Sequence, residues 1–258
     1  MNLDIFYIIS FFLIGIMFGS FYNLVGLRIP NHQSIVKPRS HCDKCGHVLK
    51  WYELIPIISY IIQKGKCKNC KTPLSLLYPF SELALGLLFM VSYYSFGFTY
   101  EFLISLILSC VMVLVTVSDL SYLMIPDRFI FIPIILILLI KLIFLGLKTF
   151  LFSVFSGFIC FLIMYLIMKF GEYIFKKECL GGADVKLMIL SGVTLEPFLS
   201  LLVIILASFI ALPVSLFLLF RHKENIIPFG PFLVIGILVI FFLKLDTMSI
   251  VGFLLGRS

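Results

Sequence analysis

Residues 102–119 read FLISLILSCVMVLVTVSD, an uncharged apolar run that ends at an aspartate. A run of about 17–25 such residues is long enough to cross about 30 Å of hydrocarbon as an α-helix. The whole chain is 62% hydrophobic and only 13% charged, with a mean hydropathy of +1.17, which is the composition of a membrane protein and not of a soluble domain. Similar runs lie at 5–27, 76–96, 128–147, 150–170, 185–196, 197–220 and 228–243.

The apolar runs predict an all-α fold, a polytopic membrane helical bundle of about eight spans. Backbone groups in lipid must be hydrogen-bonded within their own segment, and the runs are too long for tilted barrel strands. The run at 185–196 is short, so we expect a half-span there or a segment that merges with its neighbour. Lys141 lies in the outer third of the run at 128–147. It can mark a polar cavity, but we favour snorkelling of its amine toward the nearer interface.

Positive charge is concentrated between Arg28 and Lys71. This segment holds nine Lys or Arg residues against the acids Asp43 and Glu53. Cytoplasmic loops of membrane proteins carry such an excess, so we expect this loop inside and the N-terminus outside. A basic patch can also bind nucleic acid, but the adjacent span makes topology the simpler explanation, and we expect no nucleic-acid partner. The same rule places further loops inside at 120–127, 171–184 and 221–227.

The cytoplasmic loop carries four cysteines in two C-x-x-C pairs, Cys42 with Cys45 and Cys67 with Cys70. Two such knuckles match a tetrahedral zinc site with four thiolates, which is a closed, structural site. Two disulfides are the alternative, but a reducing compartment keeps thiols free and favours zinc. We therefore divide the chain into a first transmembrane helix at 1–27, a zinc-binding cytoplasmic loop at 28–75 and a transmembrane bundle at 76–258.

Three aspartates stand at the cytoplasmic ends of the apolar runs: Asp119, Asp127 and Asp184. Asp127 follows a proline at a helix start, where an acid satisfies free N–H groups and faces the positive end of the helix dipole. Asp184 follows Gly181 and Gly182, which leave room for a substrate backbone to approach. Two juxtaposed carboxylates that share a proton can activate water directly. The spacing alone leaves open whether Asp119 and Asp184 meet.

Several blocks of this sequence, in order, resemble the bifunctional type IV prepilin peptidase family, a family of intramembrane aspartyl proteases. The blocks are Gly19-Ser20-Phe21-Tyr22-Asn23, Arg28-Ile29-Pro30, Arg39-Ser40-His41-Cys42, Cys45-Gly46-His47, Trp51 to Pro56, Ser59-Tyr60, Tyr78-Pro79 to Glu82, Asp119 with Ile125-Pro126-Asp127, and Gly181 to Lys186. Ala183 stands where the family's second motif has a glycine, and we expect activity to survive this small change.

The resemblance implies that Asp119 and Asp184 are catalytic and that Asp127 supports the motif. It implies a protease in the bacterial inner membrane that cuts the basic leaders of prepilins or pseudopilins at the cytoplasmic face. It also implies S-adenosylmethionine-dependent N-methylation of the new terminus, for which Glu82 is the candidate residue, although an acid at a helix start has a structural explanation too. We expect the zinc loop to lie over the catalytic site.

Three other functions compete with this interpretation. A membrane transporter would use the acids as an ion or proton relay, but its acids would lie near the middle of the bilayer. A presenilin-like protease would carry a Tyr-Asp motif within a span and has no need of the cysteine loop. A non-enzymatic, zinc-bearing assembly factor would use the aspartates only as helix caps.

Overall fold

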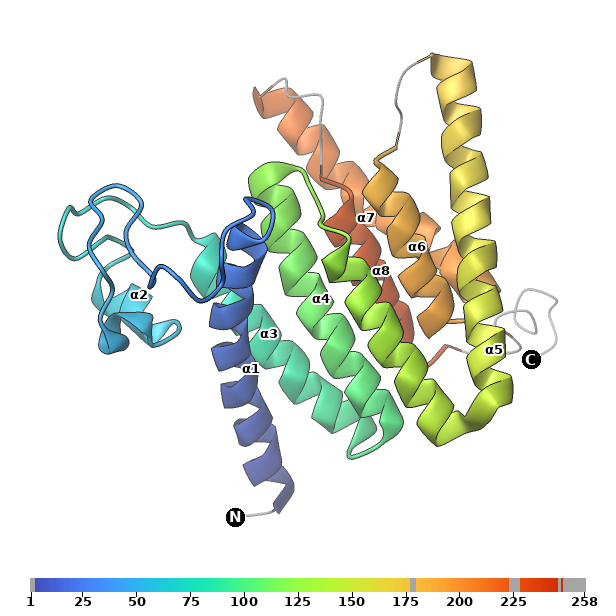
Figure 1. Ribbon diagram of the computed structural model, residues 1–258, viewed down its shortest axis with the longest axis horizontal. Coiled ribbons are helices and arrows are strands. Elements are labelled where there is room, and N and C mark those ends of the chain that lie inside the picture. Colours follow the sequence, from blue (N-terminus) through green and yellow to red (C-terminus); the bar gives the residue numbers. More distant parts are fainter. Residues whose placement is uncertain (1–2, 177–179, 223–227, 246, 248–258) are drawn as a thin grey trace.

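The computed structural model describes residues 3–176, 180–222, 228–245 and 247, which exclude parts of two predicted inside loops, 177–179 and 223–227. Most of the described chain is helical (Figure 1). The α-helices are α1 (Leu3–Arg28), α2 (Ile58–Ile62), α3 (Leu77–Phe96), α4 (Tyr100–Tyr122), α5 (Arg128–Phe175), α6 (Gly182–Thr194), α7 (Pro197–His222) and α8 (Gly230–Phe242), with a short 3-10 helix η1 (Trp51–Leu54). The described residues form only two isolated β-bridges, so the all-α prediction is confirmed.

Four helices, α1, α4, α5 and α7, are long and apolar enough to cross a membrane, which makes the chain a multi-pass membrane protein. The 48-residue α5 joins two of the predicted runs, 128–147 and 150–170. It bends at Gly146, whose φ of 83° is readily adopted only by glycine. Figure 1 shows the chain reversing at this bend, so that the two parts of α5 form a V with α6 between them.

The pairing of α1 with α3 fixes both ends of the loop at 28–75, because the loop connects these two helices. Gly19 permits the close approach, since a Cβ there would lie 2.7 Å from the Cα of Glu82. Nearer the loop, the Nδ2 of Asn23 donates to the carbonyl of Tyr78 at 3.2 Å. The hydroxyl of Ser81 donates to the Oδ1 of Asn23 at 2.6 Å.

The main core lies where α4, α5, α6, α7 and α8 meet, and α6 packs against α5, α7 and α8. Leu108, Ile130, Leu187, Leu233 and Ile237 are fully buried there. The predicted short segment at 185–196 is a separate helix that begins earlier, at Gly182. Asp184 therefore lies inside the first turn of a helix enclosed by packed neighbours.

Lys141 does not snorkel as predicted. Its ammonium donates to the hydroxyl of Ser153 at 3.0 Å and to the carbonyls of Val193 at 2.7 Å and Thr194 at 3.1 Å. These two carbonyls belong to the last turn of α6, where no intrahelical donor is available. Lys141 thus caps the end of α6 that lies opposite Asp184, and its charge suits the negative end of the helix dipole.

We expect Lys141→Met to lower the free energy of unfolding by about 1–3 kcal/mol, because buried acceptors at the end of α6 lose their donor. Thermal unfolding of the purified protein in detergent measures the change. Lys148→Met is the matched control, since Lys148 is exposed on the same helix. Equal unfolding midpoints for the two variants would show that the cap contributes nothing.

Candidate functional site

Asp119 lies in the last turn of α4, where the helix dipole disfavours an acid. The side chain does not cap its own helix. It is buried, with the residue 7% exposed, and its Oδ2 accepts the N–H of Gly230 at 3.2 Å. Gly230 is the first residue of α8, so the carboxylate of Asp119 faces the positive end of a different helix. The carboxylate is disfavoured at the end of its own helix, but a hydrogen bond from another helix compensates for this.

Asp184 lies in the first turn of α6, and the residue is 8% exposed. The negative charge of Asp119 acts on Asp184, so the structure brings these two predicted residues together. A Cβ at Gly181 would lie 3.1 Å from the Oδ2 of Asp184. A Cβ at Gly182 would meet no atom of the described residues within 4 Å, so none of them fills the space beside Gly182.

Gly230 is a site residue that the sequence did not reveal. A Cβ at this position would lie 3.0 Å from the Oδ2 of Asp119 and 2.6 Å from the side chain of Ile125. Its N–H is also the donor to Asp119. Gly230 therefore contributes to the site both by this hydrogen bond and by leaving room for the Asp119 carboxylate. The only signal in the sequence is Pro231, which marks a helix start but not the carboxylate beside it.

Asp127 forms an ion pair with Lys186, with 2.6 Å between its Oδ1 and the lysine Nζ. It is the N-cap residue of α5 but makes no side-chain capping hydrogen bond, so the predicted satisfaction of free N–H groups is wrong. The pair joins the start of α5 to the first part of α6, two residues after Asp184. Both partners are partly exposed, and such pairs contribute about 0–1 kcal/mol. The contact orients the two segments more than it stabilises them.

The two buried carboxylates have the arrangement of a general acid–base pair. Each lies at a helix N-terminus, Asp119 at that of α8 and Asp184 at that of α6, where a negative charge is favoured. Two carboxylates that repel each other do not readily ionise at the same time, and a pair of this kind can share one proton. A pair in this state can take a proton from water and give one to a carbonyl oxygen.

The four cysteines of the loop converge as the spacing predicts. All four Sγ atoms lie within 4.8 Å of one another, with Cys42 and Cys70 3.7 Å apart and Cys45 and Cys67 4.0 Å apart. Zinc–sulfur bonds of about 2.3 Å in a tetrahedron separate the sulfur atoms by about 3.8 Å. The described cysteines are free thiols, so the alternative of two disulfides is wrong. The cluster has the geometry of a four-thiolate metal site.

The two knuckles share one backbone geometry. The N–H of Gly46 donates to the carbonyl of Cys42 at 2.8 Å, and the N–H of Lys71 donates to that of Cys67 at 3.0 Å. Gly46 and Lys71 both have a left-handed φ, of 68° and 58°. Hydrogen bonds with the side chain and backbone of Thr72 lower the pKa of the Cys70 thiol to about 6. This favours the thiolate, which is the form that binds metal.

Glu53 holds η1 against the first knuckle. Its Oε2 accepts the N–H of Lys50 at 2.8 Å and lies 3.2 Å from the Nε2 of His47. The Lys50 N–H, with a smaller contribution from His47, lowers the pKa of this carboxyl below its usual value. The other oxygen, Oε1, is buried and has no hydrogen-bond partner among the described residues. Glu53 is a second residue whose structural role the sequence did not reveal.

Glu82 lies in α3 and joins this helix to the loop. Its Oε2 accepts the N–H of Ile57 at 2.7 Å, and Ile57 has an unusual φ of 59° for a β-branched residue. Figure 1 shows the loop beside α1, on the side away from α6. The expectation that the loop lies over the catalytic site is therefore wrong.

Comparison with known proteins matches this chain in two regions. Residues 13–96 match the bacterial peptidase A24 N-terminal domain, and residues 106–216 match the type IV leader peptidase family. A protein of Vibrio cholerae named prepilin leader peptidase/N-methyltransferase is 30% identical over 252 residues, which cover 92% of this chain and 96% of the relative.

This chain belongs to the type IV leader peptidase family.

Two further relatives of this chain have the same name as the Vibrio cholerae protein. The Myxococcus xanthus protein is 36% identical over 70% of this chain, and the Bacillus subtilis protein is 41% identical over 45% of it. The matches span about half of these two relatives, 54% and 47% of their lengths. No solved structure matches the chain. The N-terminal match contains the cysteine cluster, and the second match contains Asp119 and Asp184.

We expect Cys42→Ser and Cys70→Ser to lose the metal that the purified wild-type protein retains, because three thiolates no longer complete a closed site. Elemental analysis of protein purified without added metal measures the content per chain. Cys110→Ser is the matched control, since Cys110 lies in α4 and outside the cluster. A wild-type protein that carries no zinc, or a Cys42→Ser variant that carries as much as the wild type, would contradict the assignment.

Proposed function

We propose that this protein is a prepilin leader peptidase, an aspartic endopeptidase that removes the basic leaders of type IV prepilins or pseudopilins. Asp119 and Asp184 are its catalytic residues. One observation carries the proposal: two buried carboxylates from different helices come together at one end of the bundle, in a member of the type IV leader peptidase family. The names of the relatives support the same activity.

The position of Asp119 argues against the cap-only alternative. A capping aspartate satisfies free N–H groups at the start of its own helix. Asp119 lies at the end of α4 and accepts an N–H from α8. The transporter alternative is also disfavoured, because both acids lie at helix ends on one side of the bundle and not along a path through it.

In the proposed reaction, the ionised carboxylate takes a proton from water, and the resulting hydroxide attacks the carbonyl carbon of the scissile peptide bond. The protonated carboxyl gives its proton to the carbonyl oxygen. Collapse of the tetrahedral intermediate breaks the C–N bond, and a proton returned through the pair leaves with the new amine. The space beside Gly182 gives the extended substrate backbone room to approach.

The topology proposed for this enzyme is that of the bacterial cytoplasmic membrane. The N-terminus lies outside, and the loop and both aspartates lie on the cytoplasmic side, following the positive charge of the loop. If α5 crosses twice by reversing at Gly146, the chain has eight helical segments in its bundle, of which α6 and α8 are short. The domains are then 1–27, 28–75 and 76–258.

We infer that the four-cysteine cluster binds zinc in a structural role, and that the protein uses S-adenosylmethionine to methylate the new N-terminus. The first inference is supported by the tetrahedral sulfur spacing, and the second by the names of the relatives. Gly181 and Gly182 support the catalytic motif, as does Asp127 through Lys186. Glu82 stays the candidate residue for methyl transfer, and its contact with Ile57 also supports a role in anchoring the loop.

We expect Asp119→Asn and Asp184→Asn each to abolish leader removal from a synthetic prepilin, because neither variant can exchange the shared proton. Mass spectrometry of the peptide after incubation with protein in detergent measures the loss of the leader. Asp43→Asn is the matched control and retains cleavage, since Asp43 is exposed in the loop at 28–75. Normal cleavage by either catalytic-site variant, or none by a folded wild type, would refute the dyad.

We expect Glu82→Gln to retain cleavage and lose methylation. Glutamine can still accept the N–H of Ile57 and hold the loop, but it lacks the charge of the acid. The same peptide assay with S-adenosylmethionine detects the gain of one methyl group. Glu101→Gln, at the start of α4, controls for the loss of an acid elsewhere. Full methylation by Glu82→Gln would leave Glu82 with the anchoring role alone.

A further inference from the structure

The cytoplasmic loop exposes large apolar side chains that no described part of the protein covers. They come from the two short helices η1 and α2 and form what we call the apolar edge: Trp51, Leu54, Ile58, Ile61 and Ile62, with exposed fractions of 78%, 44%, 55%, 68% and 74%. These residues are not part of the long membrane helices, so the crossing of the membrane by those helices does not by itself explain their exposure. Such a patch marks a surface that binds a partner.

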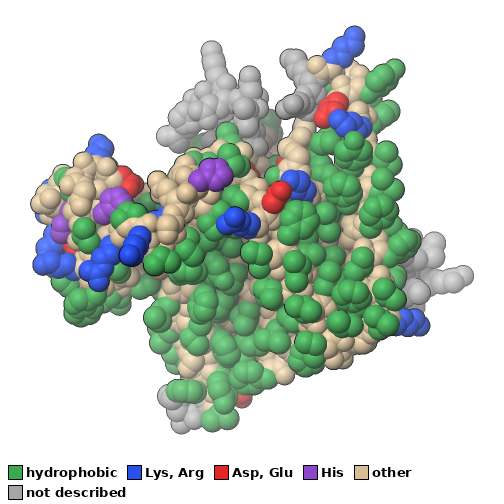
Figure 2. Space-filling view, viewed as in Figure 1, with side chains coloured by type: hydrophobic (Ala, Val, Ile, Leu, Met, Phe, Trp, Pro, Cys, Tyr) green, Lys and Arg blue, Asp and Glu red, His purple; other side chains and the backbone are tan. Residues whose placement is uncertain are grey.

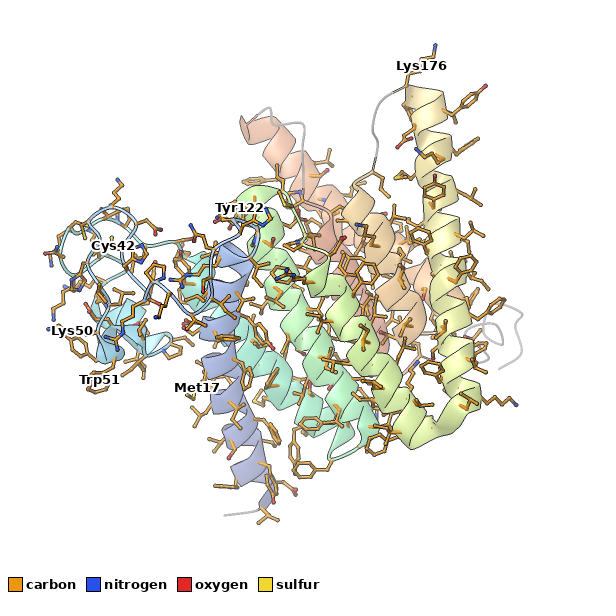
Figure 3. All side chains as sticks on the ribbon, in the orientation of Figure 1. Met17, Cys42, Lys50, Trp51, Tyr122 and Lys176 are labelled. Atoms are coloured by element: carbon orange, nitrogen blue, oxygen red, sulfur yellow. The ribbon has the colours of Figure 1, made fainter. Side chains whose placement is uncertain are left out.

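The apolar edge lies at the depth of the membrane helices. In Figure 3, Cys42 lies near the level of Tyr122, which ends α4, whereas Trp51 lies level with Met17 on α1. Met17 stands about three helical turns before Arg28, or about 16 Å at about 1.5 Å per residue. The stretch of α1 between them is uncharged. The edge therefore lies beside apolar helix and not beyond its charged end.

Basic side chains border the apolar edge. Lys50 directly precedes Trp51, and Lys64 follows Ile62 by two residues; both lysines are exposed. Figure 2 shows hydrophobic side chains along the underside of the loop and Lys and Arg side chains around its outer side. Apolar and aromatic residues below with cations at the rim are the pattern of a segment that lies in the lipid interface. The cations meet the phosphates of anionic lipids.

We propose that the apolar edge of the loop docks sideways onto the lipid bilayer next to α1. Trp51 and the isoleucines of α2 insert among the acyl chains below the headgroups, and Lys50 and Lys64 contact the phosphates of anionic lipids. The loop is then attached twice, to the helices through its ends and to the membrane through its edge. This proposal does not depend on the catalytic activity; only the identity of the leaflet as the cytoplasmic one rests on the proposed topology.

The chain offers a direct test, because Trp51 is its only tryptophan. Full-length protein is reconstituted, one chain per nanodisc, in lipids with or without brominated acyl chains, and the tryptophan emission is recorded. We expect a blue-shifted emission, loss of most of the intensity in brominated lipid, and protection from the aqueous quencher acrylamide. Emission typical of water, quenched by acrylamide and insensitive to bromine, would overturn the proposal. Protection from acrylamide without quenching by bromine would show that protein covers the edge, and would overturn it equally.

A matched variant places the same probe elsewhere on the loop. Trp51→Phe combined with Lys44→Trp moves the indole to the exposed knuckle of Cys42, which lies farther from the level of Met17. We expect the opposite result there, with quenching by acrylamide and little by bromine.

The lysine contribution is tested with Lys50→Gln and Lys64→Gln together in discs that contain anionic or only zwitterionic lipid. We expect bromine quenching of the wild type to be greater in the anionic lipid, and this gain to be lost in the double variant. An equal gain in both proteins would refute the lysine–phosphate contacts.

Discussion

A carboxylate buried in a membrane protein requires a donor, and in this protein the donor joins two helices. The N–H of Gly230 reaches the Oδ2 of Asp119 and connects the C-terminal turn of α4 to the first residue of α8. The contact depends on a glycine at this position, because a side chain would occupy the space of the carboxylate. The placement of α8 in the core therefore follows from the same constraint that permits an acid at the unfavourable end of α4.

The second acid is positioned by restraining the helix that carries it. Lys141 binds the last carbonyls of α6, and the ion pair of Lys186 with Asp127 ties its first part to the start of α5. Both ends of this short helix are therefore connected to α5, whose bend at Gly146 brings its second part alongside. The distance between the two carboxylates is thus a property of the bundle and not of a flexible loop.

The sequence predicted the features that depend on local pattern. Uncharged runs indicated the helices, C-x-x-C spacing indicated the cysteine cluster, and acids at the run ends indicated the site. It did not predict contacts between distant segments, such as that of Gly230 with Asp119, because spacing carries no information on which helix ends meet. The prediction for Lys141 was wrong for the same reason, since the two carbonyls that it binds, those of Val193 and Thr194, lie about fifty residues along the chain. The residues that position the site could be identified only from the tertiary structure.

The loop lies on the side of α1 away from α6, the helix that carries Asp184. It connects α1 and α3, which Asn23 and Ser81 join to each other, and it is held to α3 by the contact of Glu82 with Ile57. The proposed cleavage reaction uses the buried carboxylates of Asp119 in α4 and Asp184 in α6. If Glu82 serves methyl transfer, it acts on the amine that the proposed cleavage step releases. Cleavage then comes before methylation whatever the layout of the bundle, because the amine does not exist until the peptide bond is cut.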